Sequence, residues 1–166
     1  MILGIDPGEM GSFGFRFKSG KVVSYSMPGT DFEINQFLNE TIEAYLDHGE
    51  EKYAFLEKVH AMPKQGVTSS FNFGGSYRAM KMLLVCNRIP FELVTPQAWQ
   101  KNLQIPKRDK SKETPRDFKK RLMGIAMQLY PDQFVGLKTI ESKLSISDSL
   151  LILEHGIRKK GIKLPF

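Results

Sequence analysis

The chain has 166 residues, 41% of them apolar and 25% charged, with a formal charge of +6 and a pI near 9.4. These values are typical of a soluble globular protein, and no run of residues is long and apolar enough to span a membrane. The length predicts a single domain over residues 1–166. The N-terminus shows no basic segment followed by an apolar core, so we expect no secretory signal.

The few cysteines and histidines exclude several kinds of site. Cys86 stands alone and falls in an apolar helical pattern, so we expect a buried, unreactive thiol and a reducing, cytoplasmic setting. The three histidines lack zinc-like spacing, and the sequence contains no P-loop and no G-x-S-x-G motif. The net positive charge favours a polyanionic partner, although an excess of lysine is also a common solubility feature.

The chain opens with an apolar run that leads directly into an acidic residue. Residues 2–6 predict a strand, and the Pro7-Gly8 pair that follows predicts a turn, so the Asp6 carboxylate should lie at the strand's end. A turn-forming role for this aspartate and a functional role remain equally open. Alternating residues at 12–17 and 21–25 predict a β-hairpin, giving three consecutive strands.

A helix and a buried strand are expected next. Thr30 and Glu33 form a capping box, and the apolar spacing behind it predicts a helix over residues 31–47. Residues 52–59 read as a strand buried on both faces, in the middle of a mixed sheet. An unpaired Glu57 in that strand would cost several kcal/mol, so we expect either a salt bridge or exposure at the strand's end, or a divalent cation shared with Asp6.

The middle of the chain is predicted as a loop, a helix and a strand. Residues 60–75 are rich in Gly, Ser, Gln and Asn and predict a loop, in which Phe71 and Phe73 either stack on bases or anchor the loop to the core. Residues 76–87 predict a helix that is apolar almost all round, which indicates either a dimer interface or deep burial. A fifth strand is expected at 90–94.

The last part of the chain combines three helices with a basic segment. Thr95 and Pro96 should open a short helix through Leu103, and a second helix should end before Tyr130. Residues 106–121 are strongly basic, which favours phosphate contacts over a merely solvated charge run. From about residue 147 a final helix is expected. Asp148 would lie in its first turn, where the helix dipole favours a carboxylate without any function, or would join Asp6 and Glu57 at a metal.

Taken together, these stretches resemble RuvC-type Holliday junction resolvases of the RNase H-like superfamily, in particular the compact phage-like versions. The resemblance rests on five stretches in the expected order: Gly4-Ile5-Asp6-Pro7-Gly8, Leu56-Glu57-Lys58-Val59-His60, Ser70-Phe71-Asn72-Phe73-Gly74, Val94-Thr95-Pro96-Gln97-Ala98-Trp99 and Asp148-Ser149-Leu150-Leu151-Ile152. It implies an α/β fold with a five-stranded mixed sheet, the first three strands antiparallel, and helices on both faces.

The resemblance also implies a metal site. Asp6, Glu57 and Asp148 would be catalytic carboxylates that bind two Mg²⁺ or Mn²⁺ ions, with Asp6 bridging them. The family often carries a further acidic residue three positions before the last one, where this sequence has Ser145. Three explanations stay open: Glu141 supplies that carboxylate from a flexible loop, Ser145 acts through a water, or the second metal binds weakly.

The remaining implications concern DNA. The resemblance places lysines near the scissile phosphate, at Lys101 together with Lys110 or Lys112. His60 stands where cellular members of the family carry an aromatic residue that stacks at the junction centre, and Phe71 or Phe73 is the substitute. Among the basic residues we also expect DNA contacts from Arg78, Lys107, Arg108 and Arg116. We therefore expect a homodimeric, metal-dependent endonuclease on four-way DNA junctions, recruited in some settings by recombination or packaging machinery. The alternatives are a broader nuclease on flaps and forks, and a junction-binding protein with weak catalysis.

Overall fold

The computed structural model describes residues 1–8, 10–59 and 66–161. Within them, five strands form one mixed sheet: β1 (Ile2–Asp6), β2 (Ser12–Arg16), β3 (Val22–Ser26), β4 (Tyr53–Glu57) and β5 (Phe91–Val94). Their order is β3-β2-β1-β4-β5, with β1–β2 and β2–β3 antiparallel and β1–β4 and β4–β5 parallel. The predicted α/β fold and the interior position of β4 are confirmed.

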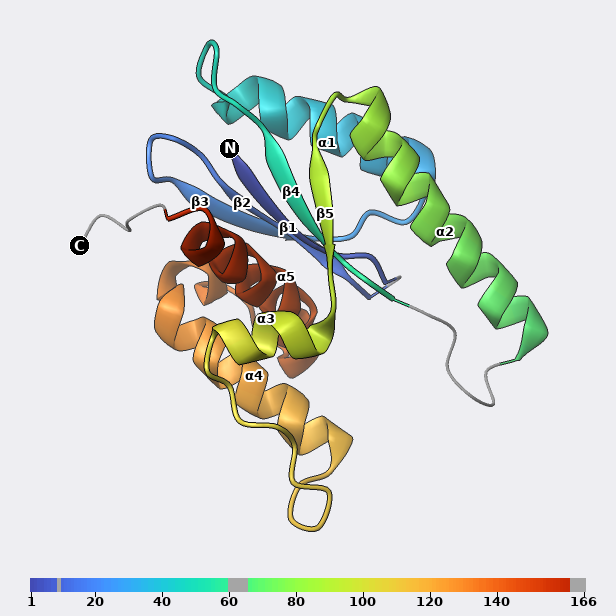
Figure 1. The fold of residues 1–166 in the computed structure, drawn as a ribbon, viewed down its shortest axis with the longest axis vertical. Helices are drawn as coiled ribbons and strands as arrows, with labels where there is room; N and C mark the ends of the chain where they lie inside the picture. The colour runs from blue at the N-terminus through green and yellow to red at the C-terminus, as the bar shows by residue number, and fades with distance from the viewer. Residues whose placement is uncertain (9, 60–65, 162–166) are drawn as a thin grey trace.

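Helices cover both faces of the sheet (Figure 1). One face carries α1 (Asp31–Tyr45) and α2 (Val67–Cys86), and the other carries α3 (Pro96–Asn102), α4 (Pro115–Leu129) and α5 (Ile140–Lys159), with a 3₁₀ turn η1 (Pro131–Phe134) between the last two. Strand alternation divides the core accordingly: Leu3 and Ile5 pack with α1 and α2, while Ile2 packs with α5.

Glycines let α5 approach the sheet unusually closely. A Cβ on Gly4 would lie 2.3 Å from the backbone nitrogen of Leu153 and 2.4 Å from the carbonyl oxygen of Ser149. A Cβ on Gly156, facing the sheet from the helix, would lie 2.4 Å from the ring of Phe55. The first glycine of the opening motif is therefore needed for backbone contact between β1 and α5 rather than for a turn.

The two predicted helix starts are confirmed, and the structure adds a third capped start. Thr30 forms the capping box with Glu33, and Thr95 caps α3 ahead of Pro96. At α4, the Thr114 hydroxyl accepts from the Asp117 backbone N–H at 3.1 Å, and the Asp117 carboxylate accepts from the Thr114 backbone N–H at 3.2 Å.

The loop expected over residues 60–75 is wrong for its second part, because α2 already begins at Val67. Residues 60–65 lie outside the described part of the chain. The Gly, Ser and Asn residues of 67–75 are poor helix formers, but Met80 and Leu84 anchor the second half of α2 in the core, and the helix continues from there toward its N-terminus. The first half extends past the sheet (Figure 1).

Three further expectations are corrected. The last helix begins at Ile140, so Asp148 lies in its interior and Glu141 is in its first turn rather than on a loop. The N-cap Thr139, which accepts from the Ser142 N–H at 3.1 Å, marks this start. Cys86 is exposed rather than buried. Deep burial of α2 is also wrong, since Met82 and Val85 are 51% and 56% exposed.

The structure also bears on membrane insertion. No helix in the described ranges has both the length and the apolar character needed to cross a bilayer.

Candidate active site

Two of the carboxylates lie side by side at one edge of the sheet. Asp6 ends β1 and Glu57 ends β4, and these strands are parallel with Ile5 opposite Leu56, so Asp6 and Glu57 are consecutive partners in the same register. Neighbouring strands are about 4.8 Å apart and side chains in register point to the same face. Both carboxylates therefore face the helices α3, α4 and α5.

The third carboxylate comes from α5. Asp148 is only 4% exposed, and its Oδ1 atom is buried without a hydrogen-bond partner. The helix is fixed against the sheet near this residue, because the Ser12 hydroxyl donates to the Ser145 carbonyl oxygen at 2.7 Å and lies 2.7 Å from the Ser149 hydroxyl. Backbone contacts of α5 thus hold Asp148 over the end of β1.

Burial and mutual repulsion perturb these acids. Burial first, and then the charge of Asp148, raise the pKa of Asp6 from its usual 3.8 to about 6. Burial and the charge of Asp6 raise the pKa of Glu57 from 4.5 to about 7, against the opposing effect of the Trp99 indole, which donates to Glu57 Oε1 at 2.9 Å. The cluster therefore holds more negative charge than its surroundings neutralise.

Among the described residues, one lysine, Lys119 of α4, forms an ion pair with this cluster. Its ammonium group forms an ion pair with the Oδ2 atom of Asp148. Burial on its own would lower the pKa of Lys119, but the charge of Asp148, its hydrogen bond and the charges of Asp6 and Glu57 raise it above its ordinary value. Three acids thus share one cation.

The donor set fits a hard divalent cation. Carboxylate oxygens are the ligands that Mg²⁺ and Mn²⁺ prefer, and the unpartnered Asp148 Oδ1 offers a free donor atom. Within residues 1–8, 10–59 and 66–161, however, no three His, Cys, Asp or Glu side chains stand close enough together to ligate one ion as they are. The arrangement is an acidic cluster that lacks compensating positive charge, and Lys119 occupies one of the two carboxylate oxygens of Asp148.

The other acidic candidates lie elsewhere. Glu141 is exposed and forms an ion pair with Arg116 at 3.6 Å. The Ser145 hydroxyl lies 3.3 Å from both the Gly11 carbonyl oxygen and the Ser26 hydroxyl, on the β2–β3 side of α5. The structure therefore brings together Asp6, Glu57 and Asp148, and neither Glu141 nor Ser145 is among the groups that shift the pKa values of Asp6 and Glu57.

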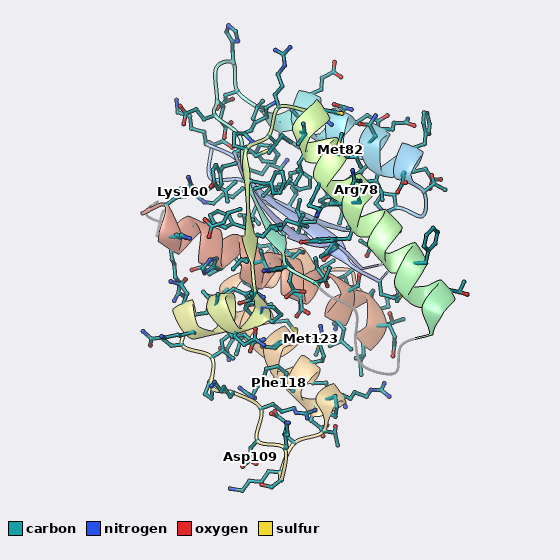
Figure 2. All side chains as sticks on the ribbon, turned by 45° about the vertical axis from the view of Figure 1, so that its right-hand side comes forward. Arg78, Met82, Asp109, Phe118, Met123 and Lys160 are labelled. Carbon is teal, nitrogen blue, oxygen red and sulfur yellow. The ribbon has the colours of Figure 1, made fainter. Side chains whose placement is uncertain are left out.

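The lysines expected near the scissile phosphate are spread over a wider surface. Lys101 is exposed on α3, and Lys110 and Lys112 are exposed in the segment between α3 and α4. Lys112 pairs with Asp109 at 3.8 Å. Figure 2 shows Asp109 at the far end of this segment, beyond Phe118 of α4.

The residues expected to contact DNA fall on two separate surfaces. Lys107 and Arg108 follow α3, and Arg116 is exposed near the start of α4. On the opposite side, Phe71 is 79% exposed and Arg78 is exposed on α2, where Figure 2 labels Arg78 beside Met82. His60 and the side chain of Phe73 lie outside the described part of the structure.

Sequence reasoning missed Lys119 and Trp99 as members of the site. Lys119 was one of eight basic residues between 106 and 121, and no sequence signal distinguishes it from the other seven. Only the packing of α4 on α5 brings its ammonium to Asp148. Trp99 carried more of a signal, since it is the only tryptophan and follows the Thr95-Pro96 helix start closely enough to turn back toward the strand ends.

The strand order and the helices on both faces give an α/β fold of the RNase H-like type, and solved structures of RuvC-type resolvases share this fold. Thermus thermophilus RuvC in complex with a Holliday junction substrate matches with a TM-score of 0.53 at 16% identity, over 99% of this chain and 98% of that chain. Another T. thermophilus RuvC structure gives 0.52 at 11% identity, with 99% of both chains covered. The yeast mitochondrial Holliday junction resolvase Ydc2 matches with a TM-score of 0.53 at 13% identity, over 96% of this chain and 78% of that chain.

Sequence comparisons add nothing to this structural likeness. No protein-family model matches the chain, and no curated protein matches it. The resemblance to RuvC-type resolvases is therefore confirmed at the level of the fold.

Proposed function

We propose that this chain is a metal-dependent endonuclease that resolves four-way DNA junctions by paired, symmetric nicks. The observation that carries the proposal is the buried carboxylate cluster of Asp6, Glu57 and Asp148, with one lysine to neutralise it and one unpartnered oxygen. Burying three acids is costly for a purely structural role, whereas metal-assisted phosphodiester hydrolysis uses such acids to hold its cations. The fold shared with two resolvases supports the junction as substrate.

The three acids suit the binding of divalent cations. Asp6 is electrostatically linked to both of the other acids, since the charge of Asp148 raises the pKa of Asp6 and the charge of Asp6 raises that of Glu57. Asp6, Glu57 and Asp148 would together hold the ions. When bound, Mg²⁺ or Mn²⁺ supplies an activated water and stabilises the leaving 3′ oxygen. The Trp99 indole N–H fixes Glu57 Oε1 and leaves Oε2 to bind.

Lys119 would exchange partners when the site fills. With its ammonium on Asp148, it neutralises part of the charge of the cluster. A phosphate drawn into the site offers the ammonium a second anion, and half of the Lys119 side chain is exposed, so it can turn outward. There it would stabilise the charge that develops on the phosphate oxygens. Lys101, Lys110 and Lys112 would bind neighbouring phosphates of the strand.

Paired nicks require two sites in opposed orientation, which a two-fold dimer provides. The exposed face of α2 is suited to this role. Phe71, Met82 and Val85 are 79%, 51% and 56% exposed, and at 100° per residue they fall within a stripe about 60° wide. We propose that α2 packs against its counterpart in a second copy. Replacing Met82 and Val85 together by glutamate should yield monomers in sedimentation experiments.

The test is cleavage of a labelled, mobile four-way junction with Mg²⁺ and with Mn²⁺, beside three-way and linear DNA. Wild type should nick the four-way junction symmetrically, and Asp6→Asn and Asp148→Asn should be inactive although they still bind it. Asp132→Asn, an exposed acid on η1, is the matched control and should cleave at the wild-type rate. Cleavage by Asp6→Asn at the wild-type rate would overturn the site assignment.

Two other outcomes would change the proposed function. Similar rates on all branched substrates would make the protein a broader structure-specific nuclease acting on flaps and forks. Tight junction binding without cleavage in either metal would make it a junction-binding protein, with Ser145 in place of the fourth acid as the reason.

A further inference from the structure

A cavity of about 620 Å³ lies between α3, the segment that follows it and α4. This volume is in the range of small-molecule sites. Part of its lining is apolar: buried Ile105, exposed Pro106 and half-buried Phe118. A flat apolar surface with an aromatic ring is the kind of wall against which nucleic-acid bases stack, since every base has an apolar face.

Side-chain amides supply the polar part of the lining. Gln97, Gln100 and Gln104 all face the cavity from α3 and its C-terminal end. Each amide carries both a donor and an acceptor, which is the pattern that reads the edge of a base. A surface that only tracked the DNA backbone would need neither three amides nor an apolar lining.

Cations complete the cavity. Lys101, Lys107 and Arg108 line it, and no acidic side chain is among its lining residues in the described part of the chain. A base that enters the cavity brings its phosphates close to it. The apolar lining would contact the base, and the three cations would contact the phosphates. The same cations disfavour a cationic or purely apolar ligand.

The cavity is built before any ligand arrives. The Arg121 guanidinium donates to both carboxylate oxygens of Glu113, at 2.9 and 3.0 Å, and to the Pro106 carbonyl oxygen at 3.1 Å. It also lies 4.8 Å from the centre of the Phe118 ring. One arginine therefore ties the segment after α3 to α4 and fixes the wall that contains Pro106.

Backbone geometry singles out one of the three glutamines. Gln104 has a φ of +58°, in the left-handed region that favours glycine, where it ends α3. The Gln104 N–H donates to the Lys101 carbonyl oxygen at 3.0 Å, and the Ile105 N–H donates to the Gln100 carbonyl oxygen at 2.9 Å. Glycine would serve this helix end better, so the amide side chain is retained at a backbone cost, as is common at binding sites.

The cavity lies next to the acidic cluster. The two helices that form its walls each send one residue to the carboxylates: α3 sends Trp99 to Glu57, and α4 sends Lys119 to Asp148. The cavity is on other faces of these helices, so about one helix diameter, 10–12 Å, separates it from the acids. A separation of this size places a base in the cavity within a few nucleotides of the scissile phosphate.

We propose that this cavity binds one unpaired base of the cleaved strand, within a few nucleotides of the scissile phosphate, and that Gln104 reads its edge. The proposal rests on the proposed function in that the strand is the one cut at the acidic cluster. It adds a site of base selection to a fold whose carboxylates touch only the sugar-phosphate backbone.

The test uses four-way junctions that carry 2-aminopurine at each of six positions on either side of the cleavage site, with Ca²⁺ in place of Mg²⁺. The fluorescence of 2-aminopurine rises when the base leaves its stack. Wild type should raise it severalfold at one position, and Gln104→Gly should lose most of that rise without losing junction binding or thermal stability.

A matched variant controls for relief of backbone strain. Arg88 ends α2 with the same geometry, at φ +52°, its N–H donating to the Val85 carbonyl oxygen at 3.0 Å. Arg88 lies on the lining of a separate cavity at the opposite end of the sheet. Arg88→Gly should therefore keep the full fluorescence rise. That result would show that relieving backbone strain at a helix end does not by itself remove the signal.

Each outcome decides between the two proposals. A rise that Gln104→Gly retains, or no position with a rise although the junction is cleaved in Mg²⁺, overturns the base site and leaves the nuclease intact. A position-specific rise that depends on Gln104, without cleavage in Mg²⁺ or Mn²⁺, supports the base site and refutes the nuclease. Failure to bind any junction overturns both.

Discussion

Replacing Glu57 with glutamine should stabilise the metal-free protein at pH 8. The pKa of this buried acid rises from 4.5 to about 7, and at 1.36 kcal/mol per pH unit this makes the ionised form cost the fold about 3 kcal/mol above pH 7. A glutamine has nearly the same volume, its amide oxygen can still accept from the Trp99 indole, and it carries no charge. For a chain of this length the gain corresponds to a melting temperature higher by about 6–12 °C.

The sign of the pH dependence follows from the direction of the shift. Because the folded pKa is above the unfolded one, folded Glu57 holds its proton more tightly, and wild type loses stability as the pH rises from about 4.5 to about 7. Glu57→Gln lacks that loss. The two proteins should therefore be equally stable near pH 4, diverge between pH 4.5 and 7, and differ by a constant amount above pH 7.

Thermal unfolding in EDTA from pH 4 to pH 8 measures this difference. Glu43→Gln, at an exposed position on α1, is the control and should stay within about 0.5 kcal/mol of wild type at every pH. Adding Mg²⁺ should raise the melting temperature of wild type and leave that of Glu57→Gln almost unchanged. The reasoning would be refuted if Glu57→Gln were no more stable than wild type at pH 8, or if the stability difference between the two proteins did not change with pH.

Three further predictions concern the supports of the site. Lys119→Met should raise the pKa of Asp6 above about 6, because the lysine charge lowers it, and a carbon-13 NMR titration of the carboxyl group would show this. Gly4→Ala should cost more than about 3 kcal/mol or prevent folding, since its Cβ would meet the backbone of α5, whereas Gly74→Ala, in open space on α2, should gain about 1 kcal/mol in urea unfolding. Thr114→Ala should cost about 1 kcal/mol by removing the cap of α4, and a loss below 0.3 kcal/mol would contradict the capping box.

Local signals predicted most of the fold. The run into Asp6, the hairpin over 12–25 and the Thr30 and Thr95 caps each depend on neighbours in sequence, and all appear as expected. Local signals gave the wrong prediction for the first half of α2, because residues 67–75 are helical only as an extension of a segment anchored by Met80 and Leu84. Propensity is a weak guide where tertiary packing decides.

The acidic cluster was predictable only in part. Asp6 and Glu57 stand in improbable places for carboxylates, and their parallel register follows from the strand order. Asp148 was predicted in the first turn of its helix, but it is an interior residue of α5. The helix dipole therefore does not explain its presence. Lys119 could not be found, because its contact with Asp148 depends on how α4 crosses α5.

The glycine contacts between β1 and α5 have a consequence for divergence. Since Gly4 brings two backbones together, the height of Asp148 above Asp6 is set by main-chain atoms and not by the sizes of core side chains. A lineage can then exchange nearly every apolar residue around the site without moving its carboxylates. Such an arrangement is compatible with a fold shared at 11–16% identity, and in this chain it places the strictest demand on a residue that has no side chain.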